Sequence, residues 1–303
     1  MTAYLVTIAV LVSISALIGL GLNIQWGLCG LVNFGVVGFF SLSAYSAALI
    51  SLYTDSTALG LIGAMLVSAG FSALLALLAI RLSDDYLAIV TLGFGELVRL
   101  VLLNESWLTG GALGISAIPQ PLESLTAGFE YNKVYALLCL AALAVVFIVA
   151  ELLTRSPFGR LLRAVRDDDT VAAALGKNVL LQRVKAFAIG GAMIGVAGTL
   201  HAYYLTYIDP SQFTPIVTAY AFMAVIAGGR GSNTGLLIGA GSIMLLLEGS
   251  RFLKDFISIF DGTQLAAFRL AMIGVGIIAL LICRPQGLIR EPQLIIKSNL
   301  TKE

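Results

Sequence analysis

Nine long apolar runs constrain the fold of this chain more than any other feature of its sequence. A helix needs about 20 mostly apolar residues to cross the hydrocarbon core of a bilayer. Because lipid offers no water to the backbone, each crossing segment must satisfy its own hydrogen bonds as a helix. The sequence therefore predicts an all-α membrane protein, a polytopic helix bundle with about nine spans and a range of roughly eight to ten. The runs lie at 3–22, 34–53, 58–80, 86–104, 133–153, 186–205, 213–229, 235–253 and 265–283.

The composition supports the same class of protein. Of the 303 residues, 59% are hydrophobic and 12% are charged, whereas soluble domains carry about 25% charged residues. The formal net charge of +1 argues against nucleic acid as a partner, because phosphate binding requires a basic surface. The N-terminus has no positive segment and no obvious cleavage site, so we expect the first run to be a span and not a removed signal peptide.

The distribution of Lys and Arg predicts the orientation, because cytoplasmic loops are enriched in these residues. With the N-terminus outside and nine alternating spans, thirteen of the 18 Lys and Arg residues fall inside, four fall outside, and Arg99 lies within a span. Seven of the thirteen lie in 154–185. We therefore expect an N-out, C-in chain. Residues 1–290 form a single transmembrane domain with a cytoplasmic loop at 154–185, and 291–303 form a short cytoplasmic tail.

The segment 23–33 between the first two runs mixes apolar residues and glycines with the polar side chains of Asn23, Gln25 and Asn33. Non-helical backbone at membrane depth is tolerated only where protein or water covers it. Two interpretations stay open: a broken or re-entrant segment beside a cavity, or a plain short loop.

Glycines at a spacing of four predict close helix packing. Gly191 and Gly195 share one face of a predicted helix, and Gly231, Gly235 and Gly239 share one face further along the chain. Small residues at this spacing let two helices in a membrane approach closely. We interpret these glycines as packing residues and not as a binding motif.

The cytoplasmic loop predicts two short helices. Ser156-Pro157 is typical of a helix start, since proline fits the first turn, and 158–166 form a basic amphipathic helix. An aspartate after it can cap a second helix over 170–175, because its carboxylate satisfies free N–H groups at a helix start. Gly176 is a natural stop for that second helix.

The second short helix is almost bare of polar side chains, so its apolar face needs a cover. It could dock into a groove on a soluble partner protein. Alternatively it could lie on the lipid surface, with Arg160, Arg163 and Arg166 meeting anionic headgroups. The residues alone leave both interpretations open.

Several stretches, in order along nearly the whole chain, resemble the LivM-type inner-membrane permeases of branched-chain amino-acid ABC importers. The chief ones are RSPFGRLLRAVRDDDTVAAALGKNV and KAFAIGGAMIGVAGTLHAYYLTYIDPSQF. Further stretches that agree are GLNIQWGLCGLVNFGVVGFFSLSAYSAALI, YLAIVTLGFGELVRLVLLN, LTGGALGI, VIAGGRGSNTGLLIGA and CRPQGLI. The chain departs from the usual pattern at Cys29, Val32 and Asn33. The resemblance therefore leaves the substrate open between branched-chain or other neutral amino acids and urea or a related amide.

The resemblance implies a multi-pass protein of the bacterial inner membrane that moves substrate by alternating access. It implies four kinds of partner: a homologous LivH-like permease, two cytoplasmic ATPase subunits, an extracytoplasmic substrate-binding protein and the lipid bilayer. It also implies that the loop carries a coupling helix that docks on the ATPase. The candidate coupling residues are Arg163, Arg166, Asp167, Asp168, Asp169, Val171, Ala173, Leu175 and Gly176.

Catalytic and metal-binding motifs are missing from the sequence. The segment GGRGSNTG is rich in glycine but lacks the lysine of a phosphate-binding loop, and no GxSxG or HExxH occurs. The three cysteines are far apart and His201 is the single histidine, so no metal site is expected. We expect a transport subunit that is not an enzyme and binds no cofactor, with ATP and Mg²⁺ used by the partner subunits.

Two groups of residues are candidates for the lining of a pathway. Glu96 and Arg99 are ionisable residues within a span, where such groups are costly and are functional candidates by default. They are three residues apart, so they can pair on one helix face. Either they line or gate a polar route, or they form a structural ion pair that holds the fourth span in place, which is the simpler account. The second group could serve a zwitterion with an apolar side chain, and comprises Asn33, Phe34, Ser41 and Tyr45.

Two rival functions remain on the sequence alone. An ion-driven secondary transporter would need an unpaired acidic residue at mid-membrane, and the span interiors offer Glu96 for that role. A non-transporting scaffold would bind ATPase subunits without any response to substrate.

Overall fold

The described part of the chain is almost entirely helical. The computed structural model describes residues 2–79, 82, 84–123, 130–256, 271, 274–276, 278, 282, 286–289 and 291. The one β pairing within these residues is an isolated bridge between Ile115 and Ile208. The elements are α1 (Thr2–Leu22), η1 (Asn23–Leu28), α2 (Val36–Thr54), α3 (Thr57–Ala79), α4 (Asp84–Asn104), α5 (Ser106–Thr109), η2 (Gly111–Leu113), α6 (Tyr131–Arg155), α7 (Pro157–Asp167), α8 (Asp169–Ala174), α9 (Val179–Leu205), η4 (Pro210–Gln212), α10 (Pro215–Gly228) and α11 (Asn233–Phe256).

Seven helices are long and apolar enough to cross a membrane, and they coincide with the first seven predicted spans. The eighth predicted span corresponds to α11, whose apolar part is Asn233–Gly249. The ninth, 265–283, lies outside the described residues apart from isolated positions. The polytopic helical class is therefore confirmed, whereas the count of nine and the orientation stay predictions.

The helices α1, α2 and α9 form the centre of the bundle. In the most apolar stretch of each span, 67% of the residues are buried in α1 and in α2, against 28% in α3 and in α4 and 17% in α6. In a membrane the exposed apolar side chains of these outer helices face lipid or another protein chain. The contacts of the central helix α9 with α3 are close because small residues line them, as at Gly191 of α9. There an added Cβ would lie 2.5 Å from Ser72 Cβ and 2.8 Å from the Ser68 carbonyl oxygen of α3.

The segment after α1 is neither a plain loop nor a simple continuation of the helix. It runs on as the π-helical η1, and residues 29–35 then lead without regular helix into α2. Protein covers this backbone: the Leu31 N–H donates to the Gln25 carbonyl oxygen at 3.1 Å, and the Gly35 N–H donates to Asn33 Oδ1 at 2.9 Å. The structure thus supports the broken-segment interpretation. Single π-helical turns are often found at functional sites.

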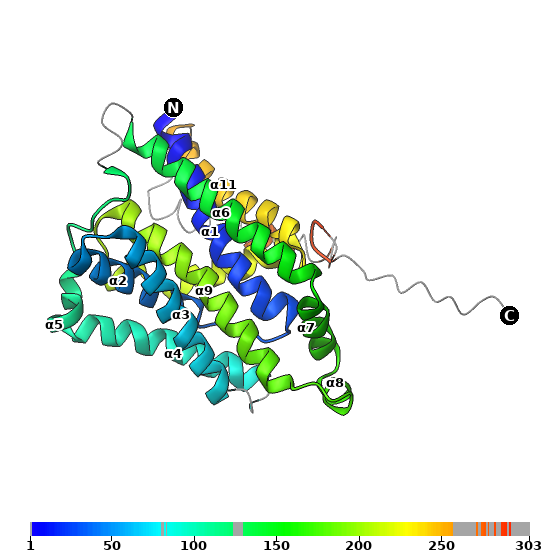
Figure 1. The fold of residues 1–303 in the computed structure, drawn as a ribbon. Helices are drawn as coiled ribbons and strands as arrows, with labels where there is room; N and C mark the ends of the chain where they lie inside the picture. Colours follow the sequence, from blue (N-terminus) through cyan, green and yellow to red (C-terminus); the bar gives the residue numbers. More distant parts are fainter. Residues whose placement is uncertain are drawn as a thin grey trace.

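Figure 1 shows that the short helices α7 and α8 lie at one end of the bundle, well away from the N-terminus. We call the end that carries α7, α8 and η1 the inner end, since the sequence predicts it to be cytoplasmic. At the opposite, outer end, the Ile115 N–H donates to the Ile208 carbonyl oxygen at 2.9 Å and joins two connecting loops. The described residues 286–289 lie at the inner end, where Leu288 N–H donates to the Ala227 carbonyl oxygen at 3.0 Å.

The close contact between α9 and α2 yields a stability prediction. A Cβ at Gly198 would collide with Ser43 Oγ and the carbonyl oxygen of Phe40, so Gly198→Ala should destabilise the fold by about 1–3 kcal/mol through overpacking. The melting temperature in mild detergent measures this. Gly70→Ala is the matched control, because nothing lies within 4 Å of its added Cβ and alanine is the better helix former. Equal melting temperatures for the two variants would contradict the packing account.

Candidate functional site

The helix α7 forms as its sequence predicts. The Ser156 side chain accepts a hydrogen bond from the Gly159 N–H at 3.4 Å, and Pro157 occupies the first turn. The apolar residues Leu162 and Val165 face the bundle and are buried. Burial of this stripe fixes α7 across the inner end of the long helices.

The helix α8 is held by a cap at each end. The Asp168 carboxylate accepts hydrogen bonds from the backbone of Thr170 and Val171 at 2.9 and 3.0 Å. The Thr170 hydroxyl and the Val171 amide hold the pKa of the Asp168 carboxyl below its usual value. At the other end Gly176 has a φ of +75°, which glycine adopts without strain. The helix spans Asp169–Ala174, one residue earlier than the predicted 170–175.

The apolar face of α8 is uncovered. Val171 is 53% exposed and Leu175 is 74% exposed, whereas Ala172 alone of this helix is buried. An ion pair of 2.9 Å between Asp169 and Arg183 ties α8 to the first turns of α9, a helix that begins at Val179, before the predicted span at 186–205. The helix is therefore fixed in direction, and no described segment of the chain covers its apolar face.

Two of the candidate coupling residues do not belong to this exposed face. Arg163 and Arg166 point toward the bundle, where both pair with the carboxylate of Glu291. Their side chains are 12% and 18% exposed, so neither is presented to lipid headgroups as the surface-lying interpretation requires. Arg160 is exposed. Asp167 is the last residue of α7, and the remaining candidates lie on α8 or at its ends, namely Asp168, Asp169, Val171, Ala173, Leu175 and Gly176.

The candidate pathway residues at the start of α2 have structural partners. The Asn33 side chain is fully buried and donates to Gln25 Oε1 at 2.7 Å, which fixes the turn into α2. Phe34 is 38% exposed, and its ring stacks on Phe222 of α10 at 4.6 Å. Asn33 therefore shapes the backbone, and the Phe34 ring reaches an accessible surface.

Ser41 and Tyr45 are buried further along α2. The Ser41 hydroxyl donates within its own helix to the Gly38 carbonyl oxygen at 2.9 Å. The Tyr45 ring packs near Phe213 at 5.9 Å, and its hydroxyl has no hydrogen-bond partner among the described residues. Ser41 and Tyr45 thus lie in the helix packing of α2, whereas Phe34 lies at an accessible surface.

Glu96 and Arg99 pair on the outward face of α4. Arg99 Nε donates to both carboxylate oxygens of Glu96 at 3.0 and 3.1 Å. The side chains of Glu96 and Arg99 are 42% and 31% exposed, and they continue a stripe with the exposed Leu92 and Leu103. Within the described part of the chain, no hydrogen bond joins the pair to another helix. The pair lies on a surface of this chain and not inside its bundle.

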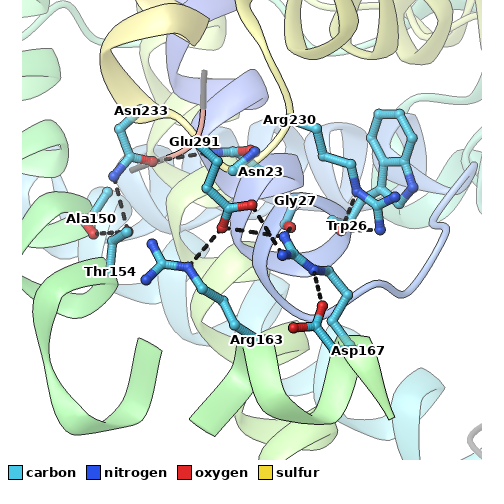
Figure 2. Close-up of polar contacts among 12 residues, drawn as sticks. Asn23, Trp26, Gly27, Ala150, Thr154, Arg163, Asp167, Arg230, Asn233 and Glu291 are labelled. Atoms are coloured by element: carbon cyan, nitrogen blue, oxygen red, sulfur yellow. Dashed lines mark hydrogen bonds and ion pairs between the residues drawn. The ribbon is translucent and has the colours of Figure 1, made fainter. Parts of the chain in front are cut away.

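Sequence reasoning missed a small apolar cavity and a polar cluster. The cavity, of about 130 Å³, lies between α1, α9, α10 and α11 and includes His201 and Gln212 in its lining. The cluster lies at the inner end, where Glu291 pairs with the arginines of α7 and Asn23 is hydrogen-bonded to Asn233 nearby (Figure 2). The polar residues of 23–33 were a signal for the cluster, but no sequence spacing connects them with Glu291.

Comparison with known proteins points to one family. The family described as "Branched-chain amino acid transport system / permease component" matches residues 4–283. The high-affinity branched-chain amino acid transport system permease protein LivM of Escherichia coli K12 is 36% identical over 98% of this chain and 73% of its own length. The probable LivM of Methanocaldococcus jannaschii is 28% identical over 92% and 91%. LivH of Salmonella typhimurium is 26% identical over 92% of each chain. No solved structure matches.

The cap of α8 gives a test of its local order. Asp168→Ala removes the acceptor of two backbone N–H groups, so the amides of 170–174 should exchange with deuterium faster than in the wild type. Asp168→Asn, which keeps an acceptor oxygen, should exchange nearly as slowly as the wild type. Unchanged exchange in Asp168→Ala would show that the cap does not hold α8.

Proposed function

The chain belongs to the family of branched-chain amino acid permease components, and we propose that it is a transmembrane permease subunit of an ATP-driven ABC importer for branched-chain or other neutral amino acids. Its relatives are named as permease proteins, so the chain is a transport subunit and not an enzyme. It is a multi-pass membrane protein, and we assign it to the bacterial inner membrane. ATP and Mg²⁺ are used by separate subunits.

The observation that carries this proposal is the exposed apolar face of α8 at the inner end of the bundle. A helix of 6 residues gains little from its own hydrogen bonds and is marginal in isolation. Here Asp168, Gly176 and the ion pair to Arg183 hold it in place, with Leu175 74% exposed. A helix fixed in this way beyond the ends of the spans is suited to enter a groove of a soluble protein. In an ABC importer that protein is the ATPase.

The proposed assembly contains this chain, a homologous LivH-like permease, two ATPase subunits and an extracytoplasmic binding protein. LivM and LivH proteins are both similar to this chain over most of its length, which supports two related permeases as the halves of one pathway. The binding protein delivers substrate to the outer end. ATP binding then displaces α8 and rocks the helices between outward-open and inward-open states.

The exposed Glu96–Arg99 pair supports a pathway beside α4. A charged pair that is about one-third to two-fifths exposed on a membrane helix is costly in hydrocarbon, and such residues normally face protein or water. We place the second permease or the aqueous route against this stripe. A neutral amino acid is a zwitterion, so one carboxylate and one guanidinium offer it partners without adding net charge.

The same pair weighs against an ion-driven secondary transporter. That mechanism requires an acidic group that is free to bind a proton or cation at mid-membrane. Glu96 instead accepts two hydrogen bonds from Arg99 Nε.

Substitutions on α8 test the docking proposal. Leu175→Asp or Ala173→Asp places a charge on the exposed face and should abolish most ATPase co-purification, because burial of an unpaired charge at an interface costs several kcal/mol, on the order of 2–5. The bundle should stay folded, since α8 lies beyond the spans. Pull-down through a tag on this chain in mild detergent measures the bound ATPase.

Leu113→Asp is the matched control for these variants. Leu113 is 83% exposed, but it lies in η2 at the outer end, so ATPase co-purification should equal that of the wild type. Full ATPase recovery with both α8 variants would refute the coupling role of α8.

An exchange of charges tests the pathway role of α4. In the double variant Glu96→Arg with Arg99→Glu, the ion pair can re-form but its polarity toward the substrate is reversed, so most amino-acid uptake should be lost at normal expression. Uptake of radiolabelled leucine into vesicles measures this. The exposed pair Glu130–Lys133, 2.9 Å apart at the start of α6, provides the control exchange. Normal uptake after the exchange at 96 and 99 would leave the pair a structural role only.

A further inference from the structure

The carboxylate of Glu291 lies between two arginines of α7 at the inner end of the bundle. Arg163 Nε donates to Glu291 Oε1 at 2.7 Å, and Arg166 Nη2 donates to Glu291 Oε2 at 3.0 Å. The three side chains are 12%, 18% and 24% exposed, for Arg163, Arg166 and Glu291 in turn. These contacts join positions more than 120 residues apart, at separations of 128 and 125. Glu291, which lies near the end of the sequence, therefore holds a helix from the middle of the sequence in place.

Arg166 also binds the distorted end of α1. Its Nη1 donates to the Gly27 carbonyl oxygen of η1 at 2.6 Å. A Cβ at Gly30, which has a φ of +87°, would lie 2.9 Å from Arg166 Cγ, so this turn leaves room for the arginine stem. A π-helical turn frees carbonyl oxygens from the regular helical pattern, and here one of them accepts from α7. The helix α7, which directly precedes α8 in the chain, is thus hydrogen-bonded to η1, the continuation of the central helix α1.

A second set of hydrogen bonds extends the cluster to α6 and to the turn between α10 and α11. The Asn23 side chain accepts from the Gly231 N–H at 3.0 Å and donates to Asn233 Oδ1 at 2.9 Å. Asn233 Nδ2 in turn donates to Thr154 Oγ1 at 3.0 Å. A Cβ at Gly231 would lie 2.7 Å from the Glu291 carboxyl carbon. Figure 2 shows Glu291 central to this cluster, with Arg163 below it and Asn23 and Asn233 above.

The charges at this cluster make Glu291 hard to replace. Two guanidinium groups share one carboxylate, and a further anion, Asp167, lies 3.3 Å from Arg166 Nε but is 70% exposed. Loss of the Glu291 charge leaves two partly buried cations side by side. Removing one partner destabilises a protein by more than the intact cluster stabilises it, because the remaining charges are left partly buried without an opposite charge.

We propose that Glu291 is a positioning residue that makes α7 move as one body with the inner ends of α1, α10 and α11. When the ATPase displaces α8, α7 follows, because the two are consecutive and share Asp168 at their junction. The Glu291 clamp then passes this displacement to η1 and to the α10–α11 turn, where the inner end of the pathway opens. This inference rests on the proposed function, since it needs an ATPase that acts through α8.

The ratio of substrate transported to ATP hydrolysed tests the clamp. The complex purified through a tag on this chain is reconstituted in liposomes with its binding protein, and radiolabelled leucine uptake and phosphate release are measured together. In Glu291→Gln the ATPase should stay bound and active, whereas leucine transported per ATP should fall by at least about fivefold, the lower range of allosteric coupling. Glu291→Asp should restore part of the ratio.

A merely structural role would give a different result. Loss of folded complex lowers uptake and hydrolysis in proportion, so an unchanged ratio in Glu291→Gln would overturn the proposal. Glu130→Gln, which breaks an exposed ion pair far from α7, is the control and should leave the ratio unchanged.

A second variant keeps the test decisive if Glu291→Gln fails to assemble. Arg163→Gln leaves the carboxylate paired with Arg166 and should lower the ratio in the same direction; an unchanged ratio in this variant would also overturn the proposal. A wild-type complex that contains no ATPase would instead overturn the proposed function before any variant is compared.

Discussion

The obligation to satisfy backbone hydrogen bonds in lipid shapes this structure. Long helices meet it within themselves, so the spans are built almost wholly from apolar and small residues. The chain departs from regular helix at depth in η1 and residues 29–35. There buried polar side chains supply the missing partners, since Asn33 fixes the turn and donates to Gln25. This segment therefore depends on several specific partners, one of which is Arg166 of α7.

The chemistry of the chain follows from that arrangement. Two groups of charged residues carry the proposals made above, one at the inner end and one on an outward stripe of α4. At the inner end, α7 is bonded both to η1 and to Glu291, and it presents α8 beyond the spans. On α4, Glu96 and Arg99 pair without support from a neighbouring helix among the described residues. In the proposed assembly, an ATPase covers α8 and a second permease or the aqueous route lies against the stripe of α4.

The local features of the fold were predictable from sequence, whereas the distant pairings were not. Ser156-Pro157, Asp168 and Gly176 act through neighbours one to four residues away, so their spacing predicted α7 and α8 to within a residue or two. The pairing of Glu96 with Arg99 also follows from a spacing of three. The side of α4 on which they lie does not, because it depends on how all the helices pack. Glu291, interpreted as the start of a tail, could not be matched to Arg163 because no local rule reaches across 128 residues.

The central claim is that α8 is covered by an ATPase and not by lipid or by this chain. A photo-reactive amino acid placed at position 175, where Leu175 is 74% exposed, tests it directly in native membranes. The account predicts one dominant cross-linked product between this chain and an ATPase subunit, and none from position 113 at the outer end. Cross-linking from position 175 to lipid alone would contradict the account and restore the interpretation of α8 as a helix on the membrane surface.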